Sequence, residues 1–151
     1  MHQGSCLCGA IRFEINAELH SPDACHCLQC RKHSGHYWAS TDVSRTSLSI
    51  HGEENITWYA SSEKVRRGFC KTCGSSLFWD PIHKDKMAVA MGAVDGPTGT
   101  QLGMHIFTSE KAITTGSPMA SPSICAEAGV NTPAVRSDAD PRPALRRSRL
   151  C

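Results

Sequence analysis

Seven of the nine cysteines in this 151-residue chain lie in three short clusters. The clusters read CLCG at residues 6–9, CHCLQC at residues 25–30 and CKTCG at residues 70–74. Thiolates with short spacers between them are typical ligands of zinc. The odd cysteine count and the absence of an export signal argue against a disulfide-stapled secreted domain, so we expect metal binding.

The third cluster has the form of a zinc knuckle. Its tight turn aims the sulfurs of Cys70 and Cys73 at one point, and Gly74 supplies the positive φ that the chain then needs. Two further ligands are required, and Cys6 and Cys8 are the natural partners. A redox-active C-x-x-C pair is the alternative, but it requires a helix N-terminus in a βαβ setting, which the sequence does not indicate.

The middle cluster offers Cys25, Cys27 and Cys30, with no obvious fourth ligand. Three protein ligands and an open position are typical of a catalytic zinc. His26 lies between two cysteines and would point away if both sulfurs point inward. The alternative is a closed structural site completed by His33, His36 or another residue.

Composition narrows the class of protein. Residues 1–116 hold eleven basic and eleven acidic side chains, so no basic face indicates nucleic acid as a partner. No apolar run approaches the roughly 18 residues of a membrane helix. The first residues do not resemble a secretory signal, so we expect a cytoplasmic protein without membrane association.

The elements that position these cysteines read as short strands. Ile11, Phe13 and Ile15 alternate with polar residues, as in a half-buried strand. Further strands are predicted at residues 36–41, 47–51, 56–60, 64–69, 76–79, 87–94 and 105–107. No stretch shows three turns of helical periodicity. The prediction is a mainly β domain over residues 1–116.

Residues 117–151 differ in composition from the rest. They contain no Phe, Tyr or Trp, and five of the eight prolines fall among them. Such a segment has little apolar surface to bury against the entropy of ordering. We predict a disordered C-terminal tail.

The motifs GSCLCG, CHCxxCRKxSG, RGFCxxCGSxLFW, MGAVD and HIFxSEKA, in this order, resemble the glutathione-dependent formaldehyde-activating enzyme family, which includes centromere protein V. The match runs from about Gly4 to Ala112. It implies a zinc-containing β-tent of antiparallel sheets and two zinc ions per chain. The implied reaction joins formaldehyde to glutathione as S-hydroxymethylglutathione, formally a carbon–sulfur lyase reaction in reverse.

The resemblance also implies roles for particular residues. A structural zinc would be held by Cys6, Cys8, Cys70 and Cys73, and a catalytic zinc by Cys25, Cys27 and Cys30. Glutathione carries two carboxylates, for which arginine and lysine are suitable partners. The candidates are Arg31 and Lys32 beside the middle cluster, and Arg66 and Arg67 before the knuckle. A non-catalytic zinc-stabilised module that binds a partner is the alternative function.

The sequence departs from the family pattern after Ala112. The family continues with an aromatic pair and then I-x-D-G, whereas this chain reads ITTGSPMASPSIC. Permitted codons read in another frame restore Asp-Tyr-Tyr-Arg-Ile-Ala-Asp-Gly. We therefore predict a frameshift caused by one base lost in the Ala112 codon, with a diverged tail as the alternative. In the frameshift interpretation Cys125 and Cys151 do not act as ligands.

Overall fold

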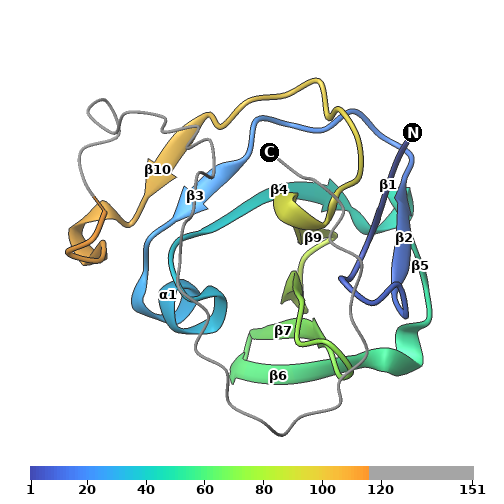
Figure 1. Ribbon diagram of the computed structural model, residues 1–151, viewed down its shortest axis with the longest axis horizontal. Helices are drawn as coiled ribbons and strands as arrows, with labels where there is room; N and C mark the ends of the chain where they lie inside the picture. Colours follow the sequence, from blue (N-terminus) through green and yellow to red (C-terminus); the bar gives the residue numbers. More distant parts are fainter. Residues whose placement is uncertain (116–151) are drawn as a thin grey trace, which may run out of the picture. The chain divides into compact units, whose positions relative to one another are not determined.

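The computed structural model describes residues 1–115, which form two β-sheets and one short α-helix (Figure 1). This confirms the predicted mainly β fold. The predicted disordered tail and frame-shifted sequence, with Cys125 and Cys151, lie outside the described residues apart from the first few positions after Ala112. The domain boundary after residue 116 therefore stays a prediction.

The smaller sheet has three antiparallel strands in the order β1-β2-β5. They are β1 (His2–Ser5), β2 (Arg12–Ile15) and β5 (Leu48–His51). Phe13 and Ile15 in β2 are buried, as the period-2 pattern predicted. The loop between β1 and β2 carries the first cysteine cluster.

The larger sheet has seven strands in the order β10-β3-β4-β9-β8-β7-β6. In that order they span Met104–Ile106, Asp23–Cys25, Trp38–Ser44, Lys86–Ala90, Ser76–Pro81, Val65–Cys70 and Ile56–Ser62. Neighbouring strands are antiparallel except β10 and β3, which are parallel. The predicted antiparallel sheets are thus confirmed, with one parallel pair added at this edge, where β10 lies beside a strand far from it in sequence.

Three elements differ from the predicted pattern. β1 and β3 were not predicted, because neither has alternating apolar residues and each is defined by pairing with a neighbour. The strand predicted at residues 87–94 ends at Ala90, and a 3₁₀ turn follows at Met91–Ala93 (η3). The remaining 3₁₀ turns are η1 (Arg45–Ser47), η2 (Glu53–Asn55) and η4 (Thr108–Glu110).

The helix α1 (Leu28–Ser34) has only seven residues, too few to show helical periodicity in the sequence. Cys27 is its N-cap, and the Cys27 sulfur accepts a hydrogen bond from the Cys30 amide at 3.4 Å. Gly35 ends the helix in the left-handed conformation with φ of 86°. No helix among residues 1–115 has the length and apolar character that crossing a membrane requires.

Aromatic contacts join the two sheets. The rings of Phe13 in β2 and Phe78 in β8 meet edge to face with centroids 5.7 Å apart. Trp58 in β6 stacks against Phe78 at 6.1 Å and covers Gly68, where a Cβ would lie 2.8 Å from the indole. Gly68 is therefore required by the close approach of Trp58.

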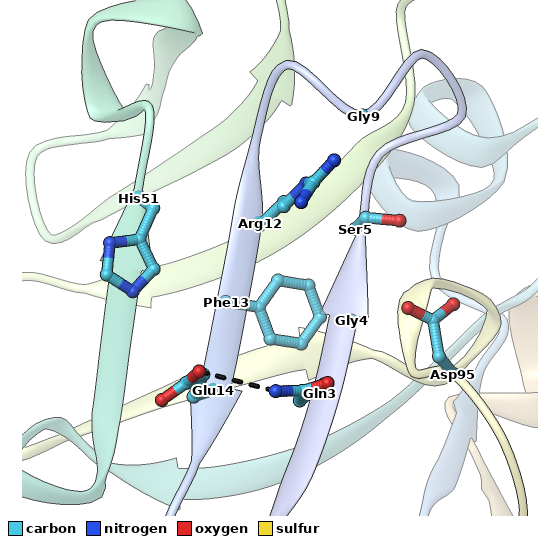
Figure 2. A pocket seen from close by; sticks show the side chains of 9 residues that line it. All are labelled: Gln3, Gly4, Ser5, Gly9, Arg12, Phe13, Glu14, His51 and Asp95. Atoms are coloured by element: carbon cyan, nitrogen blue, oxygen red, sulfur yellow. Dashed lines mark hydrogen bonds between the residues drawn. The ribbon is translucent and has the colours of Figure 1, made fainter.

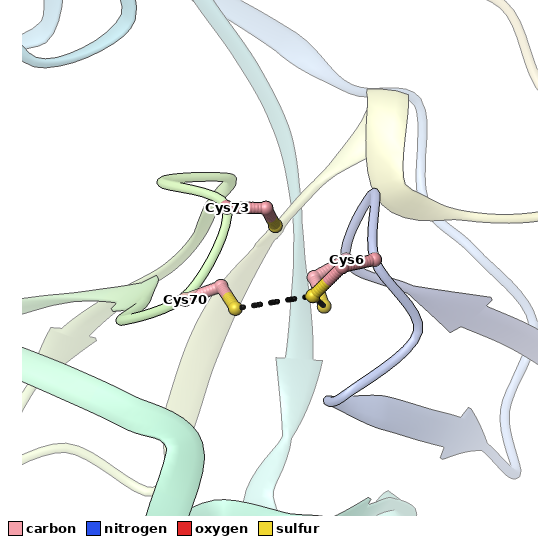
Figure 3. A group of neighbouring side chains, drawn as sticks. Cys6, Cys70 and Cys73 are labelled. Atoms are coloured by element: carbon pink, nitrogen blue, oxygen red, sulfur yellow. Dashed lines mark hydrogen bonds between the residues drawn. The ribbon is translucent and has the colours of Figure 1, made fainter. Parts of the chain in front are cut away.

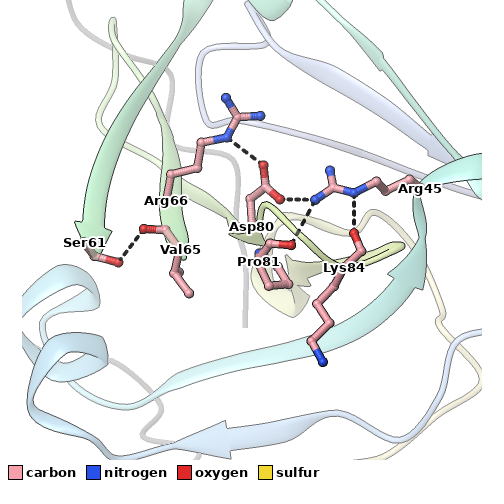
Figure 4. Close-up of polar contacts among 7 residues, drawn as sticks. All are labelled: Arg45, Ser61, Val65, Arg66, Asp80, Pro81 and Lys84. Carbon is pink, nitrogen blue, oxygen red and sulfur yellow. Dashed lines mark hydrogen bonds and ion pairs between the residues drawn. The ribbon is translucent and has the colours of Figure 1, made fainter. Parts of the chain in front are cut away.

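A buried carboxylate links three parts of the fold (Figure 4). Asp80 is fully buried and pairs with Arg45 and with Arg66, the latter at 2.7 Å. The Arg66 guanidinium also lies 4.2 Å from the Trp58 ring centroid, a cation–π contact. Arg66, a sequence candidate for binding a substrate carboxylate, is thus already paired within the fold.

Candidate metal centres

Cysteines from two distant segments of the chain meet between the two sheets, and Figure 3 labels Cys6, Cys70 and Cys73. The sulfurs of Cys6, Cys8, Cys70 and Cys73 all lie within 4.8 Å of one another. Cys8 Sγ lies 3.5 Å from that of Cys6 and 3.7 Å from that of Cys70. Zinc–sulfur bonds of about 2.3 Å in a tetrahedron separate the sulfurs by about 3.8 Å, so this cluster fits a zinc ion.

The loop after β1 presents the first two thiols. Cys6 accepts a hydrogen bond from the Ile11 amide at 3.3 Å, which stabilises a charged sulfur. Gly9 has φ of 74°, and its amide donates to the Cys6 carbonyl at 3.0 Å, which closes the turn that carries Cys6 and Cys8. This loop is bonded to the knuckle, because the Leu7 amide donates to Ser75 Oγ at 3.0 Å.

The knuckle lies between β7 and β8. Gly74 has φ of 75°, which confirms the predicted positive φ, and its amide donates to the Cys70 carbonyl at 2.9 Å. The side chain of Ser75 and then its amide lower the pKa of Cys73 to about 5. The Ala10 amide favours the charged form of Cys8, but neighbouring thiols outweigh it and raise the pKa of Cys8 to about 12. Crowded thiols resist ionising together, and a bound cation would relieve that repulsion.

The second group consists of Cys25, Cys27 and Cys30, whose sulfurs lie within 4.8 Å of one another. Cys25 ends β3, Cys27 caps α1, and Cys30 lies within the helix. Among residues 1–115, no fourth His, Cys, Asp or Glu joins this group. The arrangement offers three thiol ligands and leaves one side open.

The three histidines considered as fourth ligands lie elsewhere. The His26 ring points away from the sulfurs, and its Nε2 lies 2.8 Å from Nδ1 of His105 in β10. His33 packs edge-on against Phe69. His36 Nε2 lies 3.2 Å from the hydroxyl of Thr115. None of the three is part of the cysteine group.

A cavity of about 590 Å³ opens beside the three cysteines. Its walls include Trp38, Trp79, Asp23, Arg67 and Phe107. Of these, the sequence had indicated Arg67, as a carboxylate partner. Asp23 and Phe107 were missed, because nothing in their local sequence marks them as cavity-lining.

Arg67 is buried, with 3% of its surface exposed. Its Nη1 donates to Cys30 Sγ at 3.7 Å and its Nη2 donates to Gln29 Oε1 at 3.2 Å, while its Nε has no partner. Burial, followed by the neighbouring Cys25 and Cys27, raises the pKa of Cys30 to about 12, against the effect of Arg67. As in the four-cysteine group, a bound cation would favour ionisation of the thiols together.

Besides Arg66, which pairs with Asp80, the other three predicted glutathione contacts occupy different places. Arg67 lines both the large cavity and a neighbouring one of about 290 Å³. Lys32 lines the smaller cavity together with Tyr59 and His33. Arg31 lines neither cavity, and its Nη1 donates to the backbone carbonyl of Glu110.

Another cavity, of about 620 Å³, lies along β1 and β2 (Figure 2). Its walls are mostly polar and include Gln3, whose amide donates to Glu14 at 3.3 Å, with Arg12, His51 and Asp95. No cysteine lines it. It therefore lacks the thiol chemistry that distinguishes the cavity beside the three cysteines.

Comparison with known proteins bears on this pair of cysteine groups. The family described as glutathione-dependent formaldehyde-activating enzyme matches residues 1–110, nearly three quarters of the chain. The chain belongs to this family. The match includes all seven cysteines of both groups. The resemblance predicted from the cysteine motifs is thereby confirmed.

The individual relatives in this family share about a third of their aligned residues with the chain. A protein of Schizosaccharomyces pombe named as an uncharacterized lyase is 35% identical over 82 residues, covering 52% of this chain and 56% of that protein. A protein of Halomonas elongata named as a candidate glutathione-dependent formaldehyde-activating enzyme is 30% identical over 102 residues, covering 62% and 65%. The chain thus spans less than two thirds of either relative.

A crystal structure of a Rhodobacter sphaeroides protein supports the fold. It matches with a TM-score of 0.54 and 24% identity, covering 63% of this chain and 89% of that one. At this identity the likeness concerns the fold alone.

Proposed function

We propose that this chain is a zinc-dependent carbon–sulfur lyase of the S-(hydroxymethyl)glutathione synthase type, acting on formaldehyde and glutathione or a similar thiol. The observation that carries the proposal is the group of Cys25, Cys27 and Cys30, which has no fourth ligand among residues 1–115 and opens on a cavity. An open side is what a reacting thiol or aldehyde requires.

The chemistry is a single addition. The substrate sulfur attacks the carbonyl carbon, a carbon–sulfur bond forms, and the electron pair of the carbonyl double bond moves to oxygen, which takes up a proton. Free thiols have a pKa of about 8.5, so only a few per cent is thiolate at neutral pH. When bound by the three cysteines, zinc supplies Lewis acidity, which lowers the pKa of a thiol or polarises an aldehyde oxygen.

The residues of the chain hold the reactants together, which is the main requirement of a reaction that also proceeds without a catalyst. Trp38 and Trp79 form apolar walls that exclude water from the sulfur. Arg67 and Lys32 are proposed to receive a glutathione carboxylate, because both line the smaller adjoining cavity. A role for Arg31 in the same contact stays a prediction.

The proposed metal is zinc, at two ions per chain. The closed group of four cysteines would be structural and the open group of three catalytic. All seven cysteines among residues 1–115 are free thiols, which suits a reducing compartment, and we propose the cytoplasm.

Exchange NMR with ¹³C-formaldehyde and glutathione tests the activity. The zinc-loaded protein is expected to speed interconversion of formaldehyde hydrate and S-hydroxymethylglutathione in proportion to its concentration. Cys27→Ser should reduce the rate to that of the uncatalysed reaction, whereas Glu63→Ala, in the exposed turn between β6 and β7, should retain it. A zinc-loaded protein with no rate above background would instead favour the non-catalytic binding module.

A further inference from the structure

The segment His105–Glu110 holds the loop that carries the three cysteines. β10 pairs in parallel with β3 and places Ile106 opposite Cys25. Directly after β3, the His26 amide donates to the Ile106 carbonyl at 3.0 Å. The backbone at Cys25 is therefore fixed by β10, a strand that lies about 80 residues further along the chain.

The side chains of His26 and His105 extend this contact. His26 is 1% exposed, and its Nε2 lies 2.8 Å from Nδ1 of His105. His26 lies between Cys25 and Cys27, and successive side chains in extended backbone point to opposite sides. Holding the His26 ring toward β10 directs the two flanking sulfurs toward the cavity.

Glu110 makes the next two contacts. Its carboxylate accepts a hydrogen bond from the Leu28 amide at 2.8 Å, and its carbonyl accepts one from the Arg31 guanidinium. Leu28 is the first residue of α1, so its N–H has no acceptor within the helix. Cys27, the N-cap, accepts from the Cys30 amide instead. The Glu110 carboxylate thus accepts from the Leu28 N–H, a helix donor that the Cys27 sulfur does not reach.

Glu110 does not line the cavity, and its negative charge would oppose thiolates nearby, so electrostatic stabilisation does not explain its place. We propose that Glu110, assisted by His105, is a positioning residue that fixes the Cys25–Cys30 loop in its ligand geometry. This inference rests on the proposed metal site.

Zinc affinity of the two cysteine groups, measured by chelator competition, tests the proposal. Glu110→Ala should weaken binding at the three-cysteine group by about tenfold or more, as found when groups supporting metal ligands are removed. Glu110→Gln keeps an oxygen acceptor for the Leu28 amide and should restore part of the affinity. The four-cysteine group should be unchanged in both variants, and Glu63→Ala serves as the matched exposed control.

Two further readouts separate positioning from a general effect on stability. NMR hydrogen exchange at the Leu28 amide should be faster in Glu110→Ala and unchanged in Glu63→Ala. The visible absorption bands of Co²⁺ bound at the three-cysteine group should shift in Glu110→Ala and largely return in Glu110→Gln. Unchanged affinity, unchanged Leu28 protection and unchanged cobalt bands in Glu110→Ala would overturn the proposal.

The outcomes also distinguish this inference from the proposed function. If the unsubstituted protein binds a single zinc, the proposed function fails, whereas Leu28 exchange still reports on the Glu110 contact. If Glu110→Ala does not fold, His105→Phe keeps an aromatic ring but removes the nitrogen that contacts His26. His105→Phe should also weaken zinc binding at the three-cysteine group. Unchanged affinity in this variant would contradict the role of His105.

Discussion

The guanidinium of Arg67 lies 3.7 Å from the sulfur of Cys30, and both side chains are buried. A buried guanidinium needs a compensating charge, and among residues 1–115 no carboxylate forms an ion pair with Arg67. With the proposed zinc bound, three thiolates would carry a net charge of about −1, counting each thiolate as −1 and the ion as +2. Arg67 and the loaded cysteine group would then balance each other's charge.

Replacing Arg67 by methionine should weaken zinc binding at the three-cysteine group by about tenfold or more, because the buried charge of the thiolates is then uncompensated. Arg67→Lys keeps the positive charge and should lose less affinity. Chelator competition measures both, with the four-cysteine group as the internal reference. Equal affinity in Arg67→Met and the unsubstituted protein would show that Arg67 does not offset the thiolates.

The two cysteine groups should respond differently to substitution. Cys70→Ser removes a ligand from a site that joins the loops of both sheets, and metal-binding energy is folding energy in so small a domain, so this variant should not fold. Cys27→Ser should keep a cooperative thermal transition and lose one zinc. Thermal melting and metal analysis with and without glutathione check both.

Either of two results would reverse these assignments. A soluble, cooperatively melting Cys70→Ser protein that lacks one zinc would show that the four-cysteine site is not needed for folding. If Cys27→Ser unfolds as severely as Cys70→Ser, the middle site is structural.

Local sequence patterns predicted much of the fold. Each of the eight predicted strands overlaps an observed one. The need for two further ligands pointed to Cys6 and Cys8 as partners of the knuckle, and the structure brings the four sulfurs together. Alternation in β2 and the turn at Gly74 are properties of a few neighbouring residues. They can therefore be recognised without knowledge of the remaining chain.

The features that were not predicted depend on distant contacts. The Glu110 carboxylate reaches Leu28 from 82 residues away, and β10 pairs with β3 over a similar distance. The sequence around Glu110 contains no signal for its partner. The ion pair of Asp80 could not be predicted for the same reason. Only the folded chain shows that Asp80 pairs with Arg66, whereas Arg67 contacts Cys30.

Removing the Asp80 carboxylate should destabilise the fold without affecting the cysteine groups. Asp80 is fully buried, but its partners Arg45 and Arg66 have side chains 31% and 43% exposed and can regain water. We expect Asp80→Ala to lower the free energy of unfolding by about 2–3 kcal/mol, near the lower end for a broken buried pair. Denaturant unfolding measures the change.

The exposed pair of Asp42 and Lys86 provides the control for Asp80. Their side chains are 44% and 49% exposed, so Asp42→Ala should change the free energy of unfolding by about 0.5 kcal/mol or less. If Asp80→Ala and Asp42→Ala lower the free energy of unfolding equally, burial of Asp80 adds nothing to the strength of its ion pairs.

Phe107 combines backbone strain with a place at the cavity. It is the one non-glycine residue among residues 1–115 with positive φ, at 54°, and its 61% exposed side chain lines the cavity beside the three cysteines. A bulky residue in the left-handed region costs about 1–2 kcal/mol. Such strain persists where the surrounding structure fixes it, often at binding sites.

Two substitutions at Phe107 separate strain from binding. Phe107→Gly removes both the ring and the strain, whereas Phe107→Ala removes the ring alone. The free energy of unfolding of the glycine variant should therefore exceed that of the alanine variant by about 1 kcal/mol. If the ring covers the bound thiol, both variants should raise KM for glutathione by a similar factor, with a smaller effect on kcat. A KM that follows stability, with glycine near the unsubstituted value and alanine far from it, would assign Phe107 to holding the backbone rather than to contacting the thiol.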